Sequence, residues 1–127
     1  MPRCCTPLPD ELRLQHIVQY ASEALQFIDG RTRSDLDGDR MLAYSLVRCL
    51  EVIGEAASQV SEETRARFPE IPWRRAVGMR HRLIHSYFEV DNDRVWKTAS
   101  MELRPLVQAI VDSGAMEWSE RNSAPEE

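Results

Sequence analysis

The sequence has few cysteines and no long apolar run. Its three cysteines are Cys4, Cys5 and Cys49, an odd number, and no Cys/His spacing typical of a metal site occurs. We therefore expect no metal or other cofactor, and a cytoplasmic protein whose thiols stay reduced. No apolar stretch approaches the length of a membrane span, and the first ten residues lack the apolar centre of a secretory signal.

An excess of positive charge is also lacking. The chain of 127 residues has a formal net charge of −5. This argues against a protein that coats nucleic acid by bulk charge, but it leaves room for a local cationic site. With 43% hydrophobic and 29% charged residues, the composition is typical of a soluble globular protein. The length predicts one domain with a real core.

The most regular pattern present is helical periodicity. Apolar residues three and four positions apart, separated by turn and capping signals, predict helices over residues 10–29, 39–60, 61–68, 72–88 and 92–114. Gly30 should stop the first helix, and Pro105 should kink or divide the last one. No internal repeat, glycine-rich phosphate loop or alternating strand pattern occurs.

These elements predict an all-α fold, an antiparallel bundle of four main helices plus a short helix. We expect the helical domain at residues 10–116, after a flexible N-terminal tail over 1–9 that carries Cys4 and Cys5. Cys49 falls in an apolar helical pattern and should be a small core residue. The polar segment 117–127 is predicted to be a frayed tail.

The second predicted helix contains a glycine and two acids whose roles stay open. Gly54 costs a helix about 1 kcal/mol relative to alanine, so it indicates either the close approach of another backbone or a tolerated defect. Glu51 and Glu55 lie four residues apart on one side. They are either solvated helix charges or partners for Arg80 or for a second subunit.

Residues 71–88 form the one strongly cationic stretch and contain no acid. Its basic residues are Arg74, Arg75, Arg80, His81, Arg82 and His85. Arginine can bind a phosphate through two hydrogen bonds, and histidine can transfer a proton near neutral pH. Together they suffice to cleave RNA without a metal, although a solvated basic face is the simpler alternative. On a regular helix Arg80 and His85 lie about 140° apart, so they converge only if the helix ends or bends near His85 or if the arginine reaches across.

The segment from Arg80 to Tyr87 resembles the Arg-x4-His-x-Tyr motif of HepT-like proteins, a branch of the HEPN superfamily. CLEVIGEAASQV in the second helix is similar to the Leu-Glu-x-Ile-Gly-Glu-Ala segment of that family. Leu-Arg-Pro-Leu at residues 103–106 is similar to its Leu-x-Pro-Leu. The resemblance covers residues 10–113, nearly the whole predicted domain.

The resemblance implies a HEPN-like fold and the toxin of a toxin–antitoxin pair. Such toxins are metal-independent endoribonucleases, acting on tRNA in some cases, and form homodimers with two motifs at a shared cleft. Their antitoxin is a minimal nucleotidyltransferase, which in some pairs attaches AMP to the motif tyrosine. Carried over, Arg80 and His85 would be catalytic and Tyr87 the modification site, with Arg74, Arg75, His81 and Arg82 as candidate RNA contacts. The alternatives are a non-catalytic helical subunit that binds a nucleotidyltransferase or a nucleotide, and a purely structural helical dimer.

Overall fold

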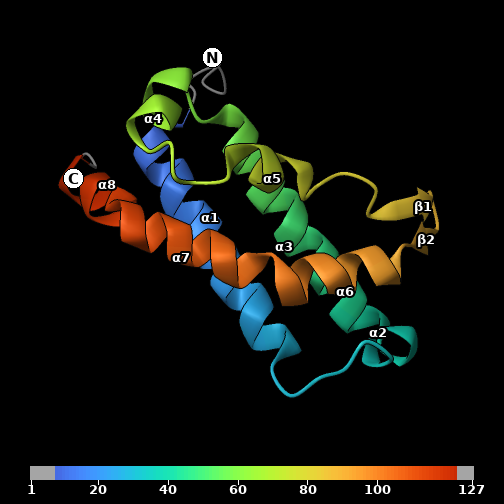
Figure 1. The fold of residues 1–127 in the computed structure, drawn as a ribbon. Coiled ribbons are helices and arrows are strands. Elements are labelled where there is room, and N and C mark those ends of the chain that lie inside the picture. Colours follow the sequence, from blue (N-terminus) through green and yellow to red (C-terminus); the bar gives the residue numbers. More distant parts are fainter. Residues whose placement is uncertain (1–7, 123–127) are drawn as a thin grey trace, which may run out of the picture.

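The protein folds as a helical bundle with one small β-hairpin (Figure 1). The structure, a computed structural model, describes residues 8–122, so Cys4 and Cys5 lie outside the described residues. The elements in chain order are α1 (Asp10–Ile28), α2 (Asp35–Gly38), α3 (Arg40–Gln59), α4 (Glu62–Arg67), α5 (Trp73–Gly78), β1 (Ile84–Ser86), β2 (Glu89–Val90), α6 (Asn92–Met101), α7 (Leu103–Ser113) and α8 (Ala115–Asn122). The prediction of an all-α fold is confirmed, although the third expected long helix is short.

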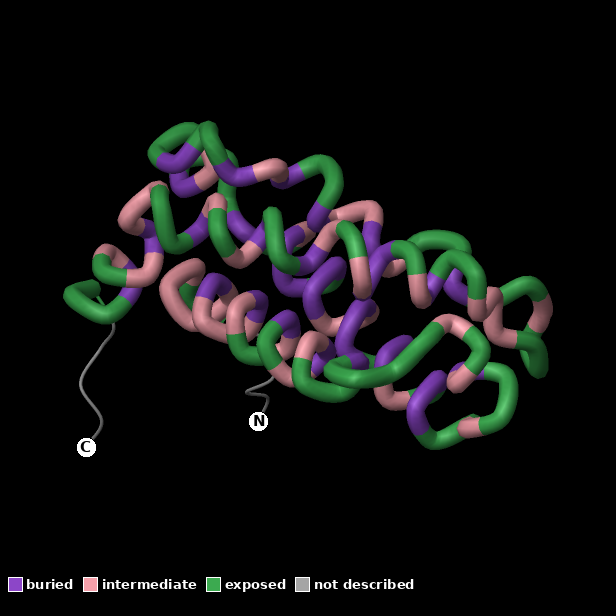
Figure 2. Tube along the Cα trace, turned by 60° about the horizontal axis from the view of Figure 1, so that its bottom comes forward, coloured by how far each residue is buried: buried purple, intermediate pink, exposed green. Residues whose placement is uncertain are grey.

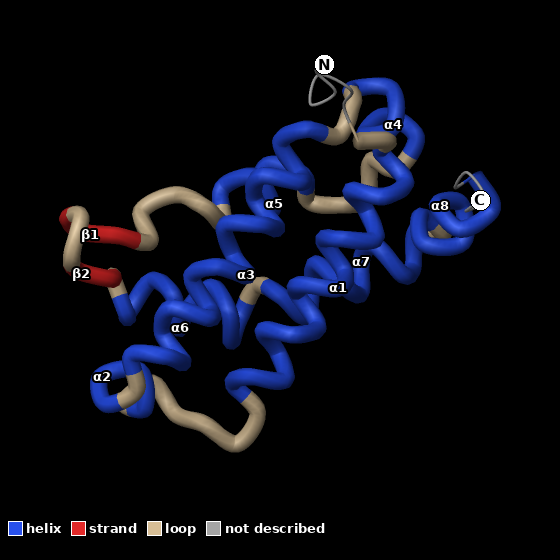
Figure 3. The backbone as a smooth tube through the Cα atoms, turned by 180° about the vertical axis from the view of Figure 1, so that it is seen from behind, coloured by secondary structure: helices blue, strands red, loops and turns tan. Residues whose placement is uncertain are grey.

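The core lies between α1 and α3, which pack along each other, and the helices that cover them (Figures 1 and 3). Buried residues line the inner faces of these helices, and exposed residues cover the outside (Figure 2). Burial of each large aliphatic side chain contributes about 1.5–3 kcal/mol. The largest fully buried apolar side chains are Leu14, Ile17, Leu36, Leu46, Leu50, Ile53, Val95, Leu103, Leu106 and Ile110. Cys49 is buried as predicted, and burial raises the pKa of its thiol to about 11.

Turn and capping residues divide the helices where the sequence predicts. After α1, Gly30 adopts the left-handed conformation with φ of +74°. α3 begins where the side chain of Asp39 accepts a hydrogen bond from the Leu42 N–H (3.1 Å). The last predicted helix is divided at Glu102 into α6 and α7. Pro105, in the first turn of α7, has no N–H to continue the α6 hydrogen-bond ladder.

The prediction of a frayed tail from Glu117 is wrong for residues 117–122. These residues belong to α8, which packs against α1. Ser119 is fully buried, and the Trp118 ring meets Phe68 edge-on with centroids 5.4 Å apart. Trp118, Phe68 and Ala115 make apolar contacts with the core. The polar composition of residues 117–127 does not reveal these contacts.

The prediction of one helix over residues 72–88 is also wrong. α5 ends at Gly78, and the chain passes through a turn into the antiparallel pair β1–β2. Arg82 has a left-handed backbone, with φ of +61°, which costs an L-residue about 1–2 kcal/mol and is incompatible with a continuing helix. β-Branched and aromatic residues dominate the segment IHSYFEV that follows, and these favour strands.

The helices of residues 8–122 all fall short of the combined length and apolar character needed to cross a bilayer.

Candidate active site at the hairpin end of the bundle

The motif residues lie on the turn and β-hairpin between α5 and α6, not on a helix. Two buried side chains, Met79 and Leu83, anchor this segment in the core. The Asp91 N–H donates to the Leu83 carbonyl (2.8 Å), which closes the segment at its far end. The angular separation of Arg80 and His85 on a regular helix therefore does not apply, because the helix ends before Arg80.

Arg80 is held against α3 by the glycine that the sequence singles out. A Cβ built on Gly54 would lie 2.7 Å from the Arg80 Cβ and 3.0 Å from its backbone nitrogen. Gly54 therefore permits a close backbone approach and is not a tolerated defect. The next residue of α3, Glu55, forms an ion pair with the Arg80 guanidinium. The Arg80 side chain keeps 35% of its surface exposed, so other N–H donors of the guanidinium can face a ligand.

His85, on β1, has a carboxylate beside it. Its Nε2 lies 3.7 Å from Oδ2 of Asp91, the residue between β2 and α6. The other carboxylate oxygen of Asp91 accepts a hydrogen bond from the Arg94 N–H (3.0 Å) and so caps α6. The contact of Asp91 with His85 was not predicted from the sequence. With 58% of its side chain exposed, His85 can reach a ligand from solvent.

The hairpin connection presents two exposed aromatic side chains. Tyr87 is 98% exposed and Phe88 is 69% exposed, and their rings meet edge-on with centroids 5.2 Å apart. A cleft of about 250 Å³ lies between the hairpin and α3. Its lining includes Tyr44 and Glu51 of α3, and Glu51 lies 4.0 Å from Arg48. Of the two predicted acidic partners, Glu55 contacts Arg80 and Glu51 faces the hairpin.

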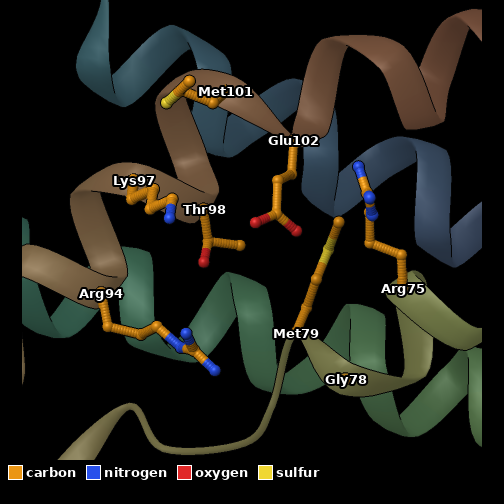
Figure 4. Close-up of a pocket in the computed structure, with 8 residues that line it drawn as sticks. All are labelled: Arg75, Gly78, Met79, Arg94, Lys97, Thr98, Met101 and Glu102. Atoms are coloured by element: carbon orange, nitrogen blue, oxygen red, sulfur yellow. The ribbon is translucent and has the colours of Figure 1, made fainter.

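Three of the other four cations of the predicted stretch line two hollows. Arg74 and His81 line one with Trp73 and Ser58, next to α3. Arg75 faces another hollow, between α5 and α6 (Figure 4). Arg82 is exposed at the left-handed turn. The sequence groups these residues as one patch, but neighbouring positions on α5 point about 100° apart.

Two basic residues that sequence reasoning did not select, Arg94 and Lys97, line the same hollow as Arg75. They are three residues apart on α6 and therefore share a face. That spacing is visible in the sequence, but the packing of α6 against α5 is not. Within residues 8–122, no group of three or more His, Cys, Asp or Glu side chains is arranged to hold a metal ion.

Comparison with known protein families identifies the family of this chain. The family described as ribonuclease HepT-like matches residues 17–112, a region that contains the whole site. The chain belongs to the ribonuclease HepT-like family.

Similar proteins have names that describe ribonucleases. A candidate RNase of Methanocaldococcus jannaschii is 38% identical over 90 residues, which is 71% of this chain and 74% of the relative. A candidate RNase of Caldanaerobacter subterraneus subsp. tengcongensis is 34% identical over 105 residues, 83% and 91% of the two chains. A probable ribonuclease HepT of Thermococcus cleftensis is 37% identical over 89 residues, 67% and 81%. No solved structure gives a significant match.

Proposed function

We propose that this HepT-like protein is a metal-independent endoribonuclease acting on RNA in the cytoplasm, with Arg80 and His85 as catalytic residues. The observation that carries the proposal is the way both side chains are supported at one end of the bundle. Arg80 packs against Gly54 and forms an ion pair with Glu55, and His85 lies beside Asp91. Both remain open to solvent. Preorganised cationic and proton-transferring groups of this kind stabilise a charged transition state.

The chemistry needs Arg80, His85, the 2′-hydroxyl of the RNA itself and a second proton-transferring group. His85 takes the proton from a ribose 2′-hydroxyl, whose oxygen attacks the adjacent phosphorus. The bond from phosphorus to the 5′-oxygen breaks, and a second proton donor protonates that oxygen. The guanidinium of Arg80 stabilises the charge on the phosphate during the transfer. The products are a 2′,3′-cyclic phosphate and a 5′-hydroxyl.

Incubation of the purified protein with RNA in EDTA tests this proposal, with tRNA as the first substrate. We expect cleavage by the wild type, with cyclic phosphate ends on the products, and none by His85→Ala. Retention of RNA by the wild type without any cut would instead indicate the non-catalytic binding subunit. Cleavage that needs an added metal would contradict the proposed mechanism.

We propose a homodimer, because each chain offers one motif histidine while the reaction needs two proton-transferring groups. The surface that supports this is apolar and lies on α3 and the hairpin. Met41 is 80% exposed, Tyr44 48% and Phe88 69%. Light scattering should give the dimer mass for the wild type and a lower mass for Tyr44→Glu, with a matching loss of cleavage. Val111→Glu on α7, at an equal 48% exposure, is the control and should stay dimeric.

We further propose that a minimal nucleotidyltransferase antitoxin neutralises the protein by attaching AMP to Tyr87. The phenol is 98% exposed in the hairpin connection, so a second enzyme can reach it without unfolding the bundle. Co-expression with a neighbouring nucleotidyltransferase should raise the intact mass by one adenylyl group. Tyr87→Phe should abolish the increase, whereas Tyr44→Phe should not. Inhibition without a mass change would indicate occlusion of the site in place of modification.

A further inference from the structure

The hollow between α5 and α6 has the composition of an anion site. It has a volume of about 440 Å³ and is lined by Arg75, Gly78, Met79, Arg94, Lys97, Thr98, Met101 and Glu102 (Figure 4). Lys97 and Arg94 come from one wall, α6, and Arg75 from the other, α5, while Glu102 lies between them. Three cations and one carboxylate leave an excess of positive charge in a chain whose formal net charge is −5.

The three cations of this hollow have no carboxylate partner among the described residues. Each ion pair within residues 8–122 uses other cations: Arg31, Arg33, Arg48, Arg80 and His85. Arg33, for example, bonds both Asp37 (3.0 Å) and Asp93 (2.6 Å). Glu102 lies in the hollow but forms no ion pair there. Like charges that face one hollow without internal partners favour an anion from outside the chain.

The hollow is joined to the candidate active site at both of its walls. On the α5 side, its lining residue Met79 directly precedes Arg80. On the α6 side, the Arg94 N–H is bonded to Asp91, whose other oxygen lies 3.7 Å from His85. Both walls of the hollow are therefore continuous along the chain with the segments that carry Arg80 and His85.

We propose that Arg75, Arg94 and Lys97 form a subsite for a backbone phosphate of the RNA substrate, next to the scissile phosphate. This inference rests on the proposed ribonuclease function and adds a substrate contact to it. Arginine binds the phosphate oxygens through its planar fork, and lysine adds a point charge. Contact is to the phosphate alone, so the subsite contributes affinity without reading base identity.

Binding of a short, fluorescein-labelled 2′-O-methyl RNA tests the subsite separately from cleavage. The probe has no free 2′-hydroxyl and cannot be cut, so fluorescence anisotropy measures affinity at several salt concentrations. The Arg94→Ala/Lys97→Ala variant should lose affinity by about tenfold at low salt, with the slope of log K against log salt reduced by about 0.7 per lost phosphate contact. Both side chains are exposed on a helix, so thermal unfolding should be nearly unchanged.

Two further variants make the test specific for this hollow. Arg121→Ala removes one positive charge from the exposed surface of α8, and the affinity of this variant should stay at the wild-type value. Glu102→Gln removes the one carboxylate of the hollow and should strengthen binding by a few-fold.

The inference is overturned if the double variant binds the probe as tightly as Arg121→Ala while wild-type protein still cuts RNA. Unchanged RNA affinity together with loss of a protein partner would also overturn it, by assigning the hollow to that partner. Failure of wild-type protein to cut RNA, with probe binding still sensitive to Arg94 and Lys97, would reject the proposed ribonuclease and leave the phosphate subsite standing.

Discussion

The two ends of the bundle treat polar and aromatic side chains in opposite ways. At the α4–α8 end, Asp10 accepts hydrogen bonds from the hydroxyls of Ser61 (2.6 Å) and Thr64 (2.7 Å). There the Trp118 ring packs on Phe68. Asp10, Ser61 and Thr64 therefore have partners within the chain, and Phe68 is buried.

At the hairpin end, comparable groups face solvent. Tyr87 and Phe88 are exposed, and His85 has a single neighbouring carboxylate at 3.7 Å. Arg82 holds a left-handed backbone there. Backbone strain and exposed aromatic and cationic groups reduce stability unless a ligand or partner uses them. From this contrast we infer that the α4–α8 end, called the closed end below, serves stability and that the hairpin end serves function. Substitutions at each end can separate the two.

The largest combined effect on function and stability is expected for Gly54→Ala. A Cβ at this position would lie 3.0 Å from the Arg80 backbone nitrogen, so Arg80 must move. A displacement of about 1 Å can lower a catalytic rate on the order of a hundredfold. The clash lowers the free energy of unfolding by about 1–3 kcal/mol. The higher helix propensity of alanine offsets about 1 kcal/mol of this loss. RNA cleavage and urea unfolding measure the two effects.

Gly38→Ala is the matched control for Gly54→Ala. Gly38 ends the short helix α2, and nothing lies within 4 Å of a Cβ built there. This variant should cleave RNA at the wild-type rate. Equal cleavage by Gly54→Ala and Gly38→Ala would show that the packing of Arg80 against Gly54 is not needed for cleavage.

A smaller effect is expected for Asp91→Asn, which should separate the two roles of Asp91. Asparagine keeps an oxygen that can cap α6, but it removes the negative charge beside His85. Cleavage should fall on the order of tenfold, with unfolding nearly unchanged. Asp91→Ala should cleave as poorly and also lose about 1 kcal/mol of stability with the cap. Wild-type cleavage by Asp91→Asn would remove Asp91 from the site.

Asp10→Ala, at the closed end, should lower stability and leave cleavage intact. The lost hydrogen bonds to the carboxylate correspond to about 1–2 kcal/mol in urea unfolding at neutral pH. Burial raises the pKa of Asp10, but hydrogen bonds from Ser61 and Thr64 outweigh burial and bring the pKa below its ordinary value. The stabilisation is therefore present above the ordinary pKa and is lost as pH falls through the lowered one.

Unfolding of wild type and Asp10→Ala at neutral and acid pH checks the predicted direction of this pH dependence. The difference in unfolding free energy between the two proteins should shrink as the pH falls. A constant difference, or a parallel loss of cleavage in Asp10→Ala, would contradict the division between the two ends.

The main helices could be predicted from the sequence because their signals are local. The apolar spacing of α1 and α3, the stop at Gly30 and the break near Pro105 each depend on a few neighbouring residues. α8 could not be predicted in this way, because its polar composition resembles a tail and its helix depends on packing against α1. Tertiary contact overrides local propensity there.

The candidate site could be predicted in its residues but not in its geometry. The basic run, the Arg80–Tyr87 motif and Gly54 are all visible in the sequence. The end of α5 is not, because it depends on the contact of Arg80 with Gly54 and on the pairing of β1 with β2. The contribution of α6 to the cationic hollow was not predicted, because Arg94 and Lys97 come to line this hollow only through long-range packing.

The most direct test of the proposed site is the rate of RNA cleavage in EDTA by His85→Ala relative to His16→Ala. His16 lies on α1, next to Gln15, whose side chain bonds Ser119 of α8 at the closed end. We expect His16→Ala to cleave within about twofold of wild type, because surface substitutions away from a site have small effects. We expect His85→Ala to be slower by at least about a hundredfold. Equal cleavage by the two variants would contradict catalysis at the hairpin end.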